Sequence, residues 1–110
     1  MARLDQLSAR TDMGWTPLHS AVYWNNFSSV EYLLKWAGAD VNARTNSGQT
    51  CLHLAGQNSA HWETLLLLFT HPLLRLTVRN DQGETAGEIA RRSCKHHALY
   101  EIVDDHLNKL

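Results

Sequence analysis

The feature that most constrains this chain is a pattern that occurs three times. The segment GWTPLHSA at 14–21 aligns with GQTCLHLA at 48–55 and with GETAGEIA at 83–90. The threonines at 16, 50 and 85 are 34 and 35 residues apart. A second pattern precedes each copy, as ART at 9–11, ART at 43–45 and VRN at 78–80. Two patterns that recur in register predict a stack of like units, so that each unit buries its apolar face against its neighbours.

The residue types within the pattern predict two helices and a turn per unit. Thr16 can cap a helix with its hydroxyl group, and Pro17 suits the first helical position. Gly38 follows an apolar helical stripe and fits the left-handed conformation that ends a helix. We expect inner helices at about 17–24, 51–58 and 86–93, and outer helices at about 28–37, 61–70 and 97–106. Extended arms with tight turns are expected at 6–14, 40–48 and 76–83.

These residues resemble the ankyrin repeat, whose T-P-L-H-x-A signature recurs with a period of 33 residues. The resemblance implies an all-α solenoid of about three repeats, each a helix-turn-helix unit with a hairpin arm. The repeats would cover 14–47, 48–82 and 83–110, with 1–13 as the trailing arm of an earlier repeat. The resemblance also implies that the histidine rings of the T-x-L-H pattern tie neighbouring turns together. It thus implies structural roles for Thr16, His19, Thr50 and His53.

The two ends of the expected stack differ. The last repeat departs toward polar residues, with Glu88 in the place of the histidine, and is expected to cap the stack. At the front, 5–12 match only the arm of a repeat, so the N-terminal flank of the first inner helix is expected to be open. The chain would then be a fragment, or a short form that packs against another surface there.

Composition narrows the classes of function. A net charge of −1 argues against a general polyanion binder. The most apolar run, at 65–69, is far shorter than the roughly 20 residues of a membrane helix. Only two cysteines, Cys51 and Cys94, are present, which favours a reducing intracellular compartment, cytoplasm or nucleus.

The seven histidines suggest a metal site or an enzyme, but their spacing favours neither. Cys51 and His53 are two residues apart and would point to different sides of a helix. Cys94, His96 and His97 are close in sequence but lack a second pair to complete four ligands. Since no nucleophile stands beside a base in a recognisable frame, we expect no catalysis, no metal and no cofactor.

The resemblance implies a protein-binding adaptor that uses the hairpin tips and the exposed side of the inner helices, here called the concave face. In the first repeat these positions are Asp12, Met13, Trp15, Tyr23 and Trp24. In the second they are Asn46, Ser47, Gln49, Gln57 and Asn58, and in the third Asp81, Gln82, Glu84, Arg92 and Ser93. Only the first set is aromatic, and binding hot spots favour Trp, Tyr and Arg. Alternatively, Trp15 and Trp24 pack onto a preceding repeat.

Arg10, Arg44 and Arg79 occupy equivalent positions and should align along the arms. They could be solvated and pair with neighbouring acids, or they could orient an acidic or polar segment of a partner protein. Nucleic acid is the least favoured partner, because Asp12, Asp81 and Glu84 lie beside the arginines in sequence. The sequence therefore predicts a non-catalytic protein-interaction module, or alternatively a subunit that oligomerises through the open N-terminal flank.

Overall fold

The described part of the chain is built from helices that coincide with the predicted ones to within two residues. A computed structural model describes residues 10–57, 62–93 and 100. The helices are α2 (Pro17–Tyr23), α3 (Phe27–Lys35), α4 (Cys51–Gln57), α5 (Trp62–Phe69) and α6 (Ala86–Ser93). No strand occurs in these residues, which confirms the predicted all-α class. The outer helix predicted at 97–106, apart from Tyr100, and the start of the first arm lie outside the described residues.

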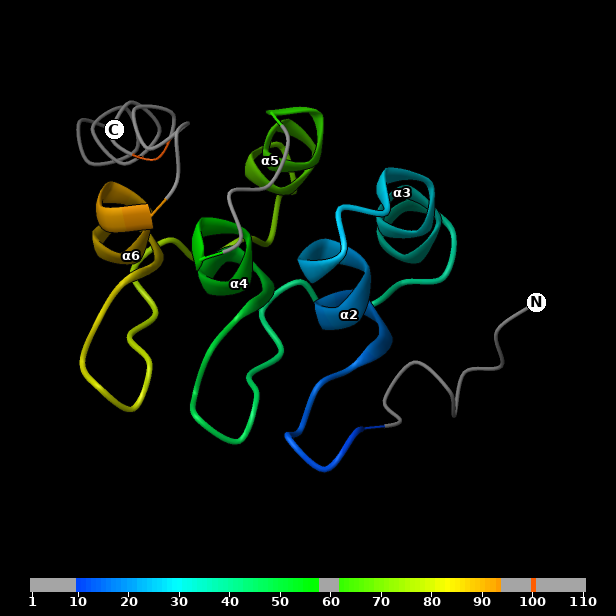
Figure 1. Ribbon diagram of the computed structural model, residues 1–110. Helices are drawn as coiled ribbons and strands as arrows, with labels where there is room; N and C mark the ends of the chain where they lie inside the picture. Colours follow the sequence, from blue (N-terminus) through cyan, green and yellow to red (C-terminus); the bar gives the residue numbers. More distant parts are fainter. Residues whose placement is uncertain (1–9, 58–61, 94–99, 101–110) are drawn as a thin grey trace.

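The helices form two rows, and the arms extend from one of them (Figure 1). The inner helices α2, α4 and α6 lie side by side, and α3 and α5 form a second row against them. The three hairpin arms leave the inner row on the same side of the molecule (Figure 1). This arrangement is the predicted repeat solenoid, while the boundaries that divide the chain into four segments stay a prediction.

Local capping explains where the first helices begin. Thr16 has extended backbone angles, φ −82° and ψ 168°, and its hydroxyl accepts a hydrogen bond from the His19 N–H. Pro17 follows as the first helical residue and needs no donor there. The Asn26 side chain accepts from the backbone N–H three residues later and caps α3 in the same way. After α3, Gly38 takes a φ of +72°.

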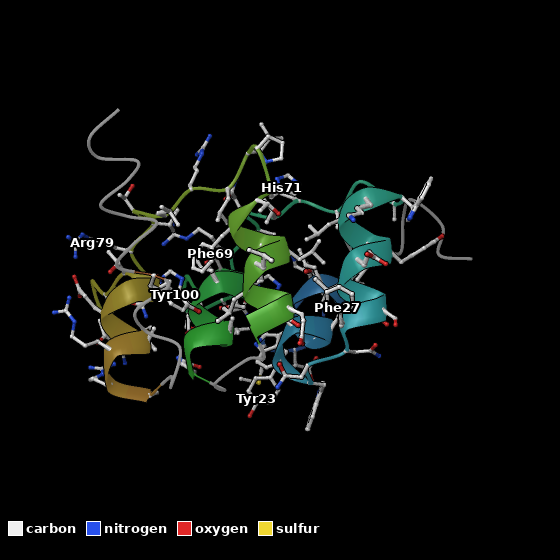
Figure 2. The ribbon with its side chains drawn as sticks, turned by 90° about the horizontal axis from the view of Figure 1, so that it is seen from above. Tyr23, Phe27, Phe69, His71, Arg79 and Tyr100 are labelled. Atoms are coloured by element: carbon white, nitrogen blue, oxygen red, sulfur yellow. The ribbon has the colours of Figure 1, made fainter. Side chains whose placement is uncertain are left out.

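The core lies between the two rows of helices. Its largest fully buried side chains come from both rows, among them Leu18, Leu52, Leu65 and Leu68. Phe69 and Tyr100 lie together among the helices, with ring centroids 5.0 Å apart (Figure 2). No helix in the described ranges is both long enough and apolar enough to span a bilayer.

Backbone hydrogen bonds close each arm and join it to the next. In the second arm, the Thr45 N–H donates to the Gln49 carbonyl at 2.8 Å, and the Gly48 N–H donates to the Thr45 carbonyl at 2.9 Å. The first and third arms repeat both bonds at the equivalent residues. Between arms, the Asn46 N–H donates to the Met13 carbonyl at 3.1 Å. The equivalent bond from the third arm to the second measures 3.0 Å, so the arms form a hydrogen-bonded row.

The glycine in each arm turn has a positive φ, but only two of the three face another arm. Gly48 and Gly83 have nearly equal φ angles of +78° and +79°. A Cβ atom on Gly48 would lie 2.6 Å from Asp81 Oδ1 and 2.8 Å from Arg44 Nη2, whereas a Cβ on Gly83 would meet nothing within 4 Å. Gly14 resembles Gly48, because a Cβ there would collide with Asn46.

This difference predicts unequal costs for the same substitution. Gly83→Ala adds only the left-handed strain and should lower the free energy of unfolding by about 1 kcal/mol. Gly48→Ala adds the same strain plus the collision with the third arm, and should lose at least twice as much. Urea unfolding followed by circular dichroism measures both variants. Equal losses would show that the arms do not approach as closely as the structure has them.

Candidate functional site

The predicted structural histidines each connect one repeat to the next. The Thr16 N–H lies 3.0 Å from His19 Nδ1, so this nitrogen accepts and carries no proton. His19 Nε2 is therefore the protonated nitrogen, and it lies 3.0 Å from the Ala43 carbonyl and 3.2 Å from the Gln49 carbonyl. His19 thus fixes the start of its own helix and the base of the second arm together.

His53 repeats this arrangement in the second unit. The Thr50 N–H lies 3.1 Å from Nδ1, and Nε2 lies 2.9 Å from the Glu84 carbonyl of the third unit. Burial is the main cause that lowers the pKa of His19 and of His53, and the nearby carbonyl oxygens oppose it only in part. Both imidazoles are therefore neutral in the folded protein near neutral pH.

The arginines along the arms make backbone contacts. Arg10 Nη1 donates to the Gly14 carbonyl of its own turn at 2.9 Å and to the Arg44 carbonyl at 2.6 Å. Arg44 likewise donates to the Gly48 carbonyl at 3.2 Å and to the Arg79 carbonyl at 2.7 Å. Each of these guanidinium groups clips two neighbouring arms together. The second expected role of the arginines, to orient a segment of a partner protein, stays a prediction.

The third repeat ends this pattern with an ion pair. Arg79 donates to its own turn at the Gly83 carbonyl at 2.8 Å, and its Nη1 lies 3.5 Å from Glu88 Oε1. Glu88 stands where His19 and His53 stand in the earlier repeats. In the described residues no further arm lies beside the third one. The Arg79 guanidinium therefore pairs with the Glu88 carboxylate in place of a carbonyl of a next arm.

On the concave face, equivalent positions of the first two repeats hold contacting side chains. The rings of Trp15 and Tyr23 have centroids 5.1 Å apart at an interplanar angle of 61°. The residues 34 positions later are Gln49 and Gln57, and Gln57 Nε2 donates to Gln49 Oε1 at 2.6 Å. Each pair joins the end of an arm to the last turn of the inner helix that follows it.

The third repeat places an ion pair at the same positions. Glu84 and Arg92 lie 35 residues beyond the glutamines, and Arg92 Nη1 is 2.6 Å from Glu84 Oε2. We call the three contacts the pair row: aromatic in the first repeat, amide in the second and ionic in the third. The positions were predicted singly but not as pairs. Their constant spacing of eight residues is the signal that could have found them.

The aromatic end of the pair row adjoins exposed side chains, although Trp15 and Tyr23 themselves are half-buried. Trp24 stacks edge-on against Tyr23, with centroids 5.1 Å apart, and is 74% exposed. Met13, at the tip of the first arm, is 65% exposed. In Figure 2 Tyr23 lies at the opposite edge of the molecule from His71, on the far side of the helix rows. The structure therefore brings together the three aromatic residues predicted to form a binding site. Asn46 lies beside the first arm, where its side-chain amide donates to the Asp12 carbonyl at 2.9 Å.

Trp24 also borders a hollow on the N-terminal flank. This hollow has a volume of about 550 Å³, and its lining residues carry no charge. They are Pro17, Ser20, Ala21, Trp24, Asn26, Ser28, Ser29, Tyr32 and Leu33. A second hollow of about 310 Å³, which Trp15 helps to line, adjoins it through Pro17 and Ser20. Trp15 and Trp24 thus lie where the concave face meets the flank.

The remaining candidates for chemistry are structural in the described residues. Cys51 is buried at the start of α4, where its thiol donates to the Val41 carbonyl at 3.3 Å. Burial raises the pKa of the Cys51 thiol to about 12, so it is not a nucleophile at neutral pH. No three His, Cys, Asp or Glu side chains of the described residues gather closely enough to hold a metal ion. Cys94, His96 and His97 lie outside the described residues.

Comparison with known proteins agrees with the repeat geometry. The family model for the ankyrin repeat matches residues 13–46. The chain belongs to the ankyrin-repeat family. Ankyrin repeats in general mediate protein–protein interaction and are not catalytic, which agrees in outline with the predicted function.

Relatives with ankyrin repeats match beyond this segment. Rabankyrin-5 of Mus musculus is 43% identical over 72 residues, which are 66% of this chain and 6% of that protein. Ankyrin repeat protein 14 of Vaccinia virus (strain Western Reserve) is 45% identical over 96 residues, 84% of this chain and 39% of the viral protein. Ankyrin repeat and SOCS box protein 11 of Mus musculus is 35% identical over 107 residues, 91% of this chain and 30% of that protein. The chain thus spans well under half the length of each of these relatives.

The neutral histidines predict a loss of stability in mild acid. In the unfolded chain a histidine titrates near pH 6.5, whereas the folded pKa of His19 and of His53 is lower. Between the two values the unfolded state binds more protons, so the free energy of unfolding is fully present above about pH 6.5 and falls as the pH falls below it. Urea unfolding at a series of pH values from about 8 to about 5 should show this decrease, and a His53→Gln variant should show a smaller one. An equal decrease in both proteins would contradict the role of His53.

Proposed function

We propose that this ankyrin-repeat chain is a non-catalytic adaptor that binds a partner protein on its concave face. The observation that carries the proposal is the aromatic cluster of Trp15, Tyr23 and Trp24, in which Trp24 is exposed and the other two side chains are half-buried. Aromatic residues supply a large contact area at a small cost in side-chain entropy, and they dominate many binding hot spots. The polar pairs of the second and third repeats suit the hydrated rim of such an interface.

Two further parts of the proposal follow from the sequence. Arg10, Arg44 and Arg79 would orient an acidic or polar partner segment with the N–H groups that their backbone contacts leave over, since a guanidinium has five donors. The adaptor would act inside the cell, in the cytoplasm or the nucleus. Within the family, the sequence also resembles ankyrin repeat domain-containing protein 49, through Trp24-Asn25-Asn26 and Ile89-Ala90-Arg91-Arg92. That resemblance stays a prediction.

The experiment compares capture of partners from cell extract by the native chain and by a triple variant, Trp15→Ala, Tyr23→Ala and Trp24→Ala. A partner identified by mass spectrometry should be retained by the native chain and lost by the variant. Its dissociation constant should rise about 30-fold or more, since truncation of a hot spot costs about 2 kcal/mol or more. Circular dichroism checks that the variant is folded.

Trp36→Ala is the matched control, because Trp36 is 79% exposed but follows α3 in the outer row. This variant should bind as the native chain does. Equal binding by the triple variant and the native chain would place the interface elsewhere.

A second candidate function is assembly through the N-terminal flank, and the hollow there is the observation that favours it. Ser20 and Ala21 line this hollow. Their equivalents in the second repeat, Leu54 and Ala55, are only 2% and 0% exposed, because the first repeat packs against that side of the second. The flank of the first repeat therefore has the position of a stacking surface that takes another helical unit.

Sedimentation equilibrium tests this candidate. If the flank binds a second copy, the native chain should form a concentration-dependent dimer that salt does not weaken, because the lining of the hollow is uncharged. Ser29→Glu, which places a charge in the hollow, should abolish the dimer, and Trp36→Ala should not. A monomer at all concentrations would contradict self-assembly and leave the concave face as the proposed site.

A further inference from the structure

The pair row changes its chemistry in one direction across the stack. Its members come from equivalent positions of three successive repeats, whose inner helices α2, α4 and α6 lie side by side (Figure 1), so the three pairs follow one another across the stack. The line begins with stacked aromatic rings, passes through a hydrogen-bonded amide pair and ends in an ion pair. The histidine ties between repeats reach this row at backbone atoms, the carbonyls of Gln49 and Glu84, so they do not depend on the side chains of the row.

The two side chains of the ion pair differ in their exposure to solvent, and the arginine is the more exposed of the two. The Arg92 side chain is 63% exposed, whereas the Glu84 side chain is 20% exposed. A ligand that lies over this pair therefore meets the guanidinium group first. Arg92 has donors left after its contact with Glu84, and a planar guanidinium is suited to binding a carboxylate.

The middle of the pair row favours an extended ligand. After the contact between Gln57 and Gln49, the two amides together keep further donors and acceptors. The backbone of an extended segment can use these groups, whereas the backbone of a helix is already hydrogen-bonded internally. The amide pair would thus bind the main chain of the partner segment. It would select only weakly among the side chains of the partner residue that lies over it.

The repeat spacing sets the length of the segment. Packed helices lie about 8–10 Å apart, so the aromatic pair and the ion pair are separated by about 16–20 Å. An extended chain advances about 3.3 Å per residue, so about five or six residues cover this distance.

We infer that the concave face recognises an extended protein segment in which a large apolar or aromatic residue is followed or preceded, five or six residues away, by an acidic residue. The apolar residue lies against Trp15 and Tyr23, and the acidic residue binds Arg92. This inference rests on the proposed function, since it names the partner chemistry of the same face.

Selection from a phage-displayed library of random linear peptides, on the folded full chain, tests the inference. The informative variant exchanges the ion pair: Glu84→Arg combined with Arg92→Glu. It keeps the net charge and the partners of the pair, so the local fold is preserved, but it places the carboxylate outside. The native chain should enrich peptides that carry an apolar residue and an Asp or Glu at the stated spacing. The exchanged variant should enrich Lys or Arg at that place with the apolar residue unchanged.

Binding of the best native-selected peptide gives the magnitude. Its dissociation constant should rise about tenfold or more on the exchanged variant, because an exposed attraction becomes a repulsion. An Arg92→Lys variant, which keeps the charge, should lose less.

The two possible failures are distinguishable. Enriched peptides whose charge preference is the same on both proteins, or that lack the spacing, would overturn the inference and leave the proposed function standing. Failure to enrich any peptide over the triple aromatic variant would overturn both.

Discussion

The rest of the structure depends on the hydrogen bond that a buried imidazole makes across a repeat boundary. His19 and His53 each accept from the capping residue of their own helix and reach a backbone carbonyl of the next unit, that of Gln49 or Glu84. One side chain thus sets the start of a helix and its distance to the neighbouring arm. Both hydrogen bonds require the neutral ring. Burial lowers the pKa of each histidine and so keeps the ring in the neutral form.

These hydrogen bonds between repeats bring the arms close together. The close approach in turn determines which residue types the arms can contain. The turn glycines with a following arm have no room for a Cβ atom, and the arginines clip one arm to the next. The third repeat has a carboxylate at the histidine position, where it pairs with Arg79 instead. At the pair row these ties reach backbone atoms, the carbonyls of Gln49 and Glu84, so the side chains of the row can differ from aromatic to amide to ion pair.

The fold could be predicted from the sequence because its determinants are local and repeated: capping threonines, a helix-ending glycine and apolar stripes at fixed spacing. The partners of the arginines could not. A guanidinium binds carboxylates and carbonyls alike, and the choice depends on how near the next arm lies. The aromatic cluster was predicted residue by residue. The sequence left open whether Trp24 faces a partner or the N-terminal flank, because its position depends on α2 ending at Tyr23 and on the turn that follows.

The central claim, that hydrogen bonds between arms and repeats hold this chain as one cooperative stack, is tested most directly by native-state hydrogen exchange. The backbone N–H groups of Asn46 and Asp81 both donate across arms. The account predicts that these two amides exchange only through global unfolding, with the same free energy of opening as buried amides of α4. Rapid exchange of both amides while α4 stays protected would show that the arms open independently, and it would contradict the account.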